Sequence, residues 1–298
     1  MSGLWADPSR AERIVERLKR IDKAEMDDMK SIQLDYTSRF ASEIVPYFLA
    51  ARSGNETGRL KTAYEIMGKW DFVESPESAG ALLFHAVLRH LVLNVYGDEM
   101  VLLGDHYLEA FTEMKYLHNR NLRELLANGT SSWIDDIRTK DKMEKIEEIL
   151  RRSFANGVEE IAEHVGVNIT NWQWGRAHSL THKHELGKIP ILNWILGLNV
   201  GPYASGGSDK SPNAGGYSFN NPYKQTAGVS MRRVVDFNNM NETQFILPTG
   251  QSGLPRSPHY RDQADLFHSG QYRTTWFDET FIRNDPQLFR RLVLVPGK

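Results

Sequence analysis

The chain has 298 residues, 40% of them hydrophobic, and a formal net charge of −2 at pH 7. This length accommodates one large domain or two ordinary ones, with a sizeable buried core. The small net charge gives no electrostatic reason to expect binding to nucleic acid or to an anionic membrane. The lack of cysteine excludes disulfides, thiolate metal ligands and a cysteine nucleophile.

No uninterrupted apolar run reaches the roughly 18 residues of a membrane span. The N-terminal stretch MSGLWADPSRAERI is charged almost at once and lacks the apolar centre of a signal peptide. We therefore expect neither a membrane span nor a signal peptide within this chain.

The first half of the sequence is patterned for helices. Asp7 is placed to cap a helix that starts at Pro8, and Ile14, Leu18 and Ile21 recur at helical spacing. The run SAGALLFHAVLRHLVLNVY is apolar over most of its surface and predicts a buried helix that ends at Gly97. Further helices are expected over residues 26–32, 60–67, 119–129 and 140–165.

The pattern changes after Gly166, where glycine, proline, serine and asparagine become frequent. Short alternating runs over 230–237 and 242–247 predict strands, and only about four such runs are convincing. We therefore expect an α+β fold, with a helical region over 1–165 and a β-rich region over 166–298. So few strands suggest a sheet that is completed by polypeptide lying elsewhere.

The densest polar cluster is WQWGRAHSLTHKHEL, which holds His178, His182 and His184. On a regular helix the first two would share a face, as a metal site requires. The stretch lacks the glutamate of a zinc-protease motif, and its glycine and tryptophans disfavour a regular helix. We expect these imidazoles to bond to neighbouring backbone and hold a bend, with a metallohydrolase site as the alternative.

Other candidate motifs are incomplete. The segment GPYASGGSDKSPNAGG matches neither phosphate-binding glycine pattern, so we expect a plain loop with Asp209 and Lys210 at its surface. No G-x-S-x-G elbow occurs, and the acidic stretches lie on amphipathic helices. Ser2 would become N-terminal if Met1 were removed, but it precedes a short lead-in to a helix, where termini fray.

Several motifs, in order along nearly the whole chain, resemble the penicillin acylase (penicillin amidase) family. The C-terminal stretch matches a G-Q-S-G element, then S-P-H-Y-x-D-Q, an aromatic residue and G-x-Y, here at 250–253, 257–263, Phe267 and 270–272. Upstream, WQWGRAHSLTHKH is similar to the family's W-x-W-G-x-x-H segment. The stretches GGSDKSPNAGGYS, SMRRVVDF and RIDKAEMDDMKSIQLDYTS also resemble family segments.

This resemblance implies part of a four-layer αββα N-terminal nucleophile hydrolase fold. Such enzymes cleave a linear amide through an acyl-enzyme on the N-terminal serine of a processed β chain. The nucleophile, the oxyanion asparagine and the usual calcium ligands of the family lie before the region that this sequence matches. The chain thus resembles the C-terminal part of a β chain, with no cofactor in this segment and inactive by itself. Its expected partners are the missing N-terminal part and a small amide substrate.

One residue of the family's active site is implied within this chain. Arg10 falls where the family has an arginine that helps position the oxyanion asparagine. A guanidinium suits that role because it keeps its charge and presents fixed donors. Arg13 and Arg17 are equally basic, and residue type does not choose among the three. In the family the 250–263 element is structural, so Ser252 and His259 are not expected to act as a dyad.

An alternative to the hydrolase segment is a non-catalytic, stand-alone binding or structural module derived from the same fold. Family resemblance also implies a periplasmic or other extracytoplasmic location. The acyl group and the amine of the substrate stay open, because pocket walls from other segments set them.

Overall fold

The computed structural model describes residues 5–286 and 293–294, so Ser2 lies outside the described residues. The chain divides into two compact units, each built from separate stretches of sequence. Unit 1 comprises Met1–Asp22, Leu34–Thr181 and Gly201–Gly228, and unit 2 comprises Lys23–Gln33, His182–Val200 and Val229–Lys298. These units are defined by contacts in space, and the division at residue 165 stays a prediction.

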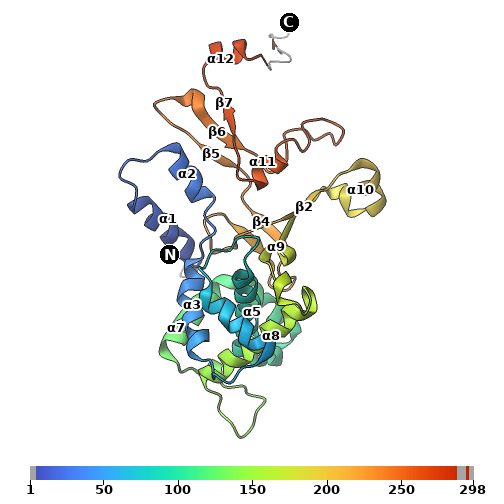
Figure 1. Ribbon diagram of the computed structural model, residues 1–298. Coiled ribbons are helices and arrows are strands. Elements are labelled where there is room, and N and C mark those ends of the chain that lie inside the picture. Colours follow the sequence, from blue (N-terminus) through green and yellow to red (C-terminus); the bar gives the residue numbers. More distant parts are fainter. Residues whose placement is uncertain (1–4, 287–292, 295–298) are drawn as a thin grey trace. The chain divides into compact units, whose positions relative to one another are not determined.

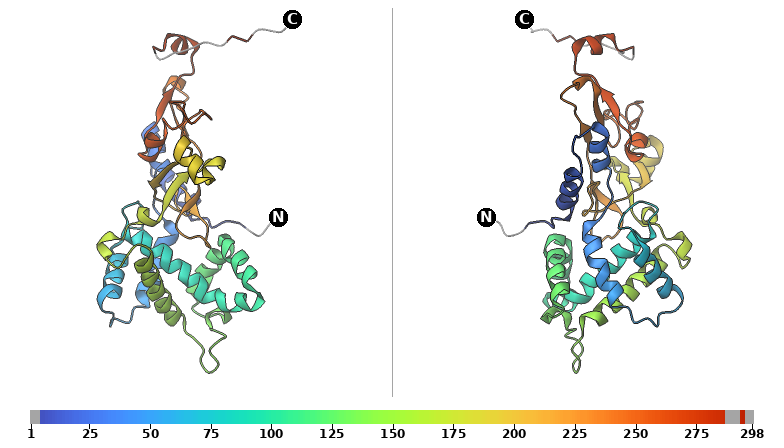
Figure 2. Two further views of the ribbon diagram at one scale, coloured as in Figure 1. Left: turned by 90° about the vertical axis from the view of Figure 1, so that its right-hand side faces the viewer. Right: turned by 60° about the vertical axis from the view of Figure 1, so that its left-hand side comes forward.

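Unit 1 is a bundle of helices around α5, which spans Ala79–Leu103 (Figure 1). Helices α4 and α8 pack against α5, and views from two further sides show the same bundle (Figure 2). The helices of this unit are α1 (Ser9–Lys19), α3 (Arg39–Ala50), α4 (Gly58–Lys69), α5, α6 (Asp105–Glu113), α7 (Lys115–Asn128), α8 (Ile146–His164) and α9 (Trp174–Ala177). The predicted helical character of the first half is confirmed.

Two predicted helix ends were wrong. Helix α1 begins at Ser9, with Pro8 as its cap, although the Asp7 carboxylate still accepts a hydrogen bond from the Ser9 amide at 3.0 Å. Helix α5 continues through Gly97 to Leu103 and ends at Gly104, whose φ of 119° is open to glycine but strained for other residues. A glycine inside a helix and a glycine that ends one look alike in sequence.

Helix α5 is the one helix among the described residues that is long and apolar enough to cross a membrane. Of the most apolar 18-residue segment of α5, 67% is buried inside the protein. Its apolar surface is covered by the neighbouring helices, as expected for the core helix of a folded unit.

A small sheet follows the bundle, with the strand order β2-β1-β4-β3. Strand β1 pairs in parallel with β4, where Leu180 lies opposite Gln225, and β3 pairs with β4 antiparallel. The strands are β1 (Ser179–His182), β2 (Val200–Ala204), β3 (Gly215–Tyr217) and β4 (Gln225–Gly228). Segments far apart in sequence thus meet at the end of the bundle.

Unit 2 contains an antiparallel sheet of order β5-β6-β7, with Arg233 opposite Phe245 and Gln244 opposite Thr274. Its strands are β5 (Arg232–Val234), β6 (Thr243–Ile246) and β7 (Arg273–Thr275), and its helices are α2 (Met26–Gln33), α10 (Pro190–Leu196), α11 (Ala264–His268) and α12 (Glu279–Asn284). The strands predicted within 230–237 and 242–247 are confirmed, and they pair with each other.

Candidate functional site

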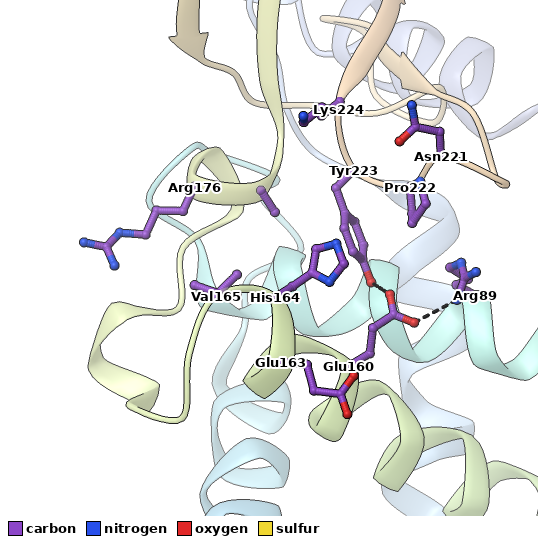
Figure 3. A pocket seen from close by; sticks show the side chains of 11 residues that line it. Arg89, Glu160, Glu163, His164, Val165, Arg176, Asn221, Pro222, Tyr223 and Lys224 are labelled. Atoms are coloured by element: carbon purple, nitrogen blue, oxygen red, sulfur yellow. Dashed lines mark hydrogen bonds and ion pairs between the residues drawn. The ribbon is translucent and has the colours of Figure 1, made fainter.

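A concave site lies in unit 1, at the C-terminal end of α8. It is a polar pocket of about 680 Å³, within the usual range for small-molecule sites. Helices α5, α8 and α9 and the segment before β4 supply its walls (Figure 3). Its lining residues are Arg89, Glu160, Glu163, His164, Val165, Arg176, Ala177, Asn221, Pro222, Tyr223 and Lys224.

Glu160 forms the floor of the pocket. Its carboxylate accepts hydrogen bonds from Arg89 Nη1 at 2.7 Å and from the Tyr223 hydroxyl, and His90 Nε2 lies 2.7 Å from the same carboxylate. Burial raises the pKa of Glu160, but the proximity of His90, the hydrogen bond from Tyr223 and the charge of Arg89 outweigh it and lower the pKa to about 2. Glu160 is therefore an ionised anchor at neutral pH and not a proton acceptor for catalysis.

Tyr223 is held in an unusual conformation beside this floor. Its φ is 77°, which a bulky residue adopts only where the surroundings require it. Its carbonyl is bonded to His178 Nδ1 and its hydroxyl to Glu160, so both ends are fixed. Burial raises the pKa of Tyr223, which keeps the phenol neutral.

The rim is open and polar. The side chains of Arg176 and Lys224 form no ion pair within the part of the chain that the structure describes, and Arg176 points away from the floor in Figure 3. No group of three or more His, Asp or Glu side chains across the described ranges has a metal-binding arrangement. The pocket has the chemistry to hold a polar molecule, but it does not assemble a nucleophile with a base.

A buried polar network lies behind the pocket. Glu74 is fully buried, its Oε1 is 3.2 Å from His85 Nε2, and His85 Nδ1 is 3.0 Å from the Tyr217 hydroxyl. The ring of Trp174 lies between His85 and His178, with centroid distances of 4.3 and 4.4 Å and interplanar angles of 17° and 6°. This network fixes the start of α9 and the histidine that bonds to Tyr223.

The three histidines of the polar cluster have separate roles. His178 caps α9 and bonds to Tyr223, and His184 accepts a hydrogen bond from the Leu186 amide at 3.1 Å. These two confirm the expected bonding to neighbouring backbone. His182 instead lies 3.3 Å from His268, between their Nε2 atoms.

The glycine-rich segment is more ordered than a plain loop. Residues at its two ends belong to β2 and β3, and Lys210 is buried, so its predicted surface position was wrong. Lys210 Nζ pairs with Asp209 at 3.0 Å and lies over the Phe40 ring at 5.5 Å. The ion pair with Asp209 offsets the cost of burying the charged Lys210 side chain. A sequence pattern does not reveal this pairing.

Helix α1 distinguishes the three arginines that the sequence left equivalent. Arg13 and Arg17 both pair with the buried Asp35, whereas the Arg10 side chain is exposed. Among the described residues Arg10 has no hydrogen bond or ion pair of its side chain. Its predicted role is not tested by this geometry and stays a prediction.

The C-terminal motif is a closed loop. The Ser252 amide donates to the His259 carbonyl at 3.1 Å, and a side chain at Gly250 would collide with the same carbonyl. Ser252 Oγ accepts from the Leu254 amide, while His259 Nδ1 pairs with Asp262 at 3.1 Å. Ser252 and His259 thus have separate partners, and the motif holds backbone together.

Sequence reasoning missed the pocket floor of Arg89, Glu160 and Tyr223. Glu160 lies on an amphipathic helix with several other acidic residues, so its position in the pattern gives no signal. Only the meeting of α5, α8 and the segment before β4 brings its partners together.

The fold is shared with a known class of enzyme. A solved chain titled thermostable penicillin G acylase from Alcaligenes faecalis matches with a TM-score of 0.56 and 18% identity, covering 99% of this chain and 54% of that one. The match confirms the predicted α+β class, as part of the αββα N-terminal nucleophile hydrolase fold.

The sequence comparisons define the family. The family model described as penicillin amidase matches residues 1–284, and the chain belongs to this family. The acyl-homoserine lactone acylases QuiP of Pseudomonas aeruginosa and Pseudomonas fluorescens are 27% and 28% identical over all of this chain and 38% and 37% of their own lengths. A penicillin acylase 2 proenzyme of Pseudomonas sp. is 32% identical over 32% of the chain. The chain thus spans well under half of the curated relatives that it matches in full.

Proposed function

We propose that this chain is the C-terminal part of a penicillin-acylase-type amidohydrolase. The complete enzyme cleaves a linear amide through an acyl-enzyme on an N-terminal serine, and that serine and the oxyanion asparagine belong to preceding polypeptide. The family match over residues 1–284 carries this proposal. The relatives that align with the whole chain, but over only 37–38% of their own length, support it.

Within that enzyme, this chain supplies support for the reacting groups. Arg10 is a positioning residue that orients the oxyanion asparagine of the preceding segment. Its exposure at the start of α1 supports this role, because its guanidinium is available to a partner while Arg13 and Arg17 are engaged by Asp35.

The partners and the location follow from the same proposal. The chain binds the N-terminal part of the acylase, and the assembled enzyme acts on a small acyl amide outside the cytoplasm. Acyl-homoserine lactones are the first substrates to test, because the relatives that align over the whole chain are named as acylases of these compounds.

The test begins with the DNA upstream of codon 1. We expect it to encode, in frame, a strand-initial serine after a spacer peptide. The chain produced with that upstream part should release homoserine lactone from an acyl-homoserine lactone, and the 298-residue chain alone should not. Absence of such a serine, or hydrolysis by the chain alone, contradicts the proposal. An inactive, monomeric chain that unfolds cooperatively, with no such upstream segment, supports the stand-alone module instead.

A further inference from the structure

Unit 2 presents an unusual apolar surface on and beside α10. Trp194 has 81% of its surface exposed, and large aliphatic side chains around it are also exposed. We define the α10 platform as residues 184–199, with the exposed apolar side chains Leu186, Ile189, Ile191, Trp194, Ile195 and Leu196. Scattered exposed apolar residues are normal, but six within eleven positions form a patch, and such patches mark interaction sites.

The platform is held rigidly from within. The side chain of Asn199 accepts from the His184 amide at 3.0 Å and donates to the Gly187 carbonyl at 3.1 Å, which ties both ends of the platform together. The Asn193 side chain accepts from the Asn199 amide at 2.8 Å. An added Cβ at Gly187 would meet the side-chain amide of Asn199, so a larger residue there would displace that side chain from its two hydrogen bonds.

The C-terminal family motif clamps the platform from outside. Tyr260 donates its hydroxyl to the Leu198 carbonyl, and Arg261 Nη2 donates to the Gly197 carbonyl at 3.1 Å. Gly197 ends α10 in the left-handed conformation, with φ of 60°. The S-P-H-Y-x-D-Q motif therefore fixes the base of a helix whose apolar side chains remain exposed.

Such an arrangement is suited to binding. Burial of exposed apolar area against a partner is favourable, and a fixed backbone lowers the entropy lost when the partner docks. The apolar centre is flanked by exposed Lys183, Glu185 and Lys188, which resembles the apolar core and polar rim of a protein interface.

The comparisons favour one occupant. The P. aeruginosa relative aligns with this chain over 38% of its length, so most of its polypeptide lies outside the shared region. We propose that the α10 platform is a docking surface for the preceding polypeptide of the same enzyme, with Trp194 as its central anchor. This inference rests on the proposed function and adds to it the surface through which this chain binds the preceding polypeptide.

Assembly of the two parts tests this inference. The chain and the polypeptide encoded directly upstream of it are produced together, with an affinity tag on the upstream part. The amount of chain recovered with the tag is then compared between variants. We expect Trp194→Asp with Ile191→Asp to lower recovery at least tenfold, because aromatic anchors dominate interface energies. Tyr260→Phe should lower it less, by loosening the clamp.

The control is Phe237→Asp, which places the same charge on another exposed aromatic residue of unit 2. It should assemble like the wild type, and both this control and the Trp194→Asp/Ile191→Asp double variant should keep the melting temperature of the wild-type chain. Equal loss with Phe237→Asp, or unchanged assembly of the double variant, overturns the docking role. If the wild-type pair assembles and hydrolyses the amide in that case, the proposed function still holds.

Other occupants give distinct results. A wild-type chain that dimerises alone through Trp194, measured by light scattering, assigns the platform to a second copy and overturns the inference. Binding to phosphatidylglycerol vesicles that is lost in the double variant assigns it to a lipid surface and does the same. A Trp194 fluorescence signal already shielded from iodide in the chain alone shows that the chain covers its own platform, which also overturns the inference.

Discussion

Arg13 Nε lies 2.8 Å from the carboxylate of Asp35, whose side chain is almost completely buried. Arg17 Nη1 approaches the same oxygen at 3.2 Å, and the Thr37 amide donates to the other at 2.8 Å. Asp35 thus joins α1 to the segment that precedes α3. The two arginines serve the fold here, which separates them from Arg10.

Replacing Asp35 should destabilise unit 1. Asp35→Asn leaves two partly buried guanidiniums without their carboxylate, and we expect a loss of roughly 1–3 kcal/mol in unfolding free energy. Burial raises the pKa of Asp35, but the hydrogen bonds from Thr37 and Arg13 lower it by more than burial raises it. The pKa of Asp35 is therefore below its usual value. The stabilisation is therefore present above pH 4 and is lost as the pH falls below it. Urea unfolding at pH 7 and at pH 3 measures both effects, and equal stability of the two proteins at pH 7 contradicts this role.

Arg10 and Arg13 should respond in opposite ways in the assembled enzyme. Arg10→Ala should lower kcat/KM by about tenfold or more with little change in melting temperature, because the asparagine that Arg10 orients stabilises the oxyanion mainly in the transition state. Arg13→Ala should lower the melting temperature and leave kcat/KM nearly unchanged at low temperature. Partial rescue of kcat by Arg10→Lys would show that charge alone provides part of the effect. An unchanged kcat/KM in Arg10→Ala removes this residue from the site.

The sequence predicted the parts of this fold that depend on local pattern. Amphipathic spacing located α1, α4 and α8, continuous apolarity located α5, and alternation located β5 and β6. It did not distinguish Gly97 from Gly104, because the end of α5 depends on which glycine adopts a positive φ. Local pattern also gave no sign of the burial of Lys210, which requires Asp209 and Phe40 to approach it in space.

The pocket is a second feature that local sequence pattern did not predict. Glu160, Arg89 and Tyr223 are separated by 63 residues or more where they bond, and no spacing rule connects them. The family motif at 257–263 was identified from its order in the chain. Its physical use, with Tyr260 and Arg261 bonded to the carbonyls that follow α10, emerged only from the structure.

Buried histidine should make the chain less stable in mild acid. Burial lowers the pKa of His118 to about 4, and its Nε2 lies 3.0 Å from the Thr112 carbonyl. Because the folded state resists protonation, the unfolded state takes up the proton first, and stability falls as the pH drops from about 6.5 toward 4. Between pH 7 and pH 5 the expected loss is about 2 kcal/mol from this residue.

His118→Gln keeps a donor for the Thr112 carbonyl but does not titrate. The variant should therefore lose less stability than the wild type between pH 7 and pH 5, measured by urea unfolding at both values. His178, whose pKa burial lowers to about 3, should contribute in the same direction and remains in both proteins. Identical pH dependence of the variant and the wild type would show that His118 takes up its proton equally well when folded.

Two glycines test the packing of the bundle as a matched pair. Gly157 lies on α8 where it crosses α5, and an added Cβ would come within 2.8 Å of the Val87 backbone nitrogen. Gly97 lies inside α5, and an added Cβ there would meet no atom within 4 Å. Gly157→Ala must push two helices apart and should cost about 1–3 kcal/mol. Gly97→Ala should instead stabilise by about 0.5–1 kcal/mol, since alanine favours a helix interior. Thermal unfolding followed by circular dichroism measures the stability of both variants. A destabilising Gly97→Ala would mean that the backbone of α5 is not helical at residue 97.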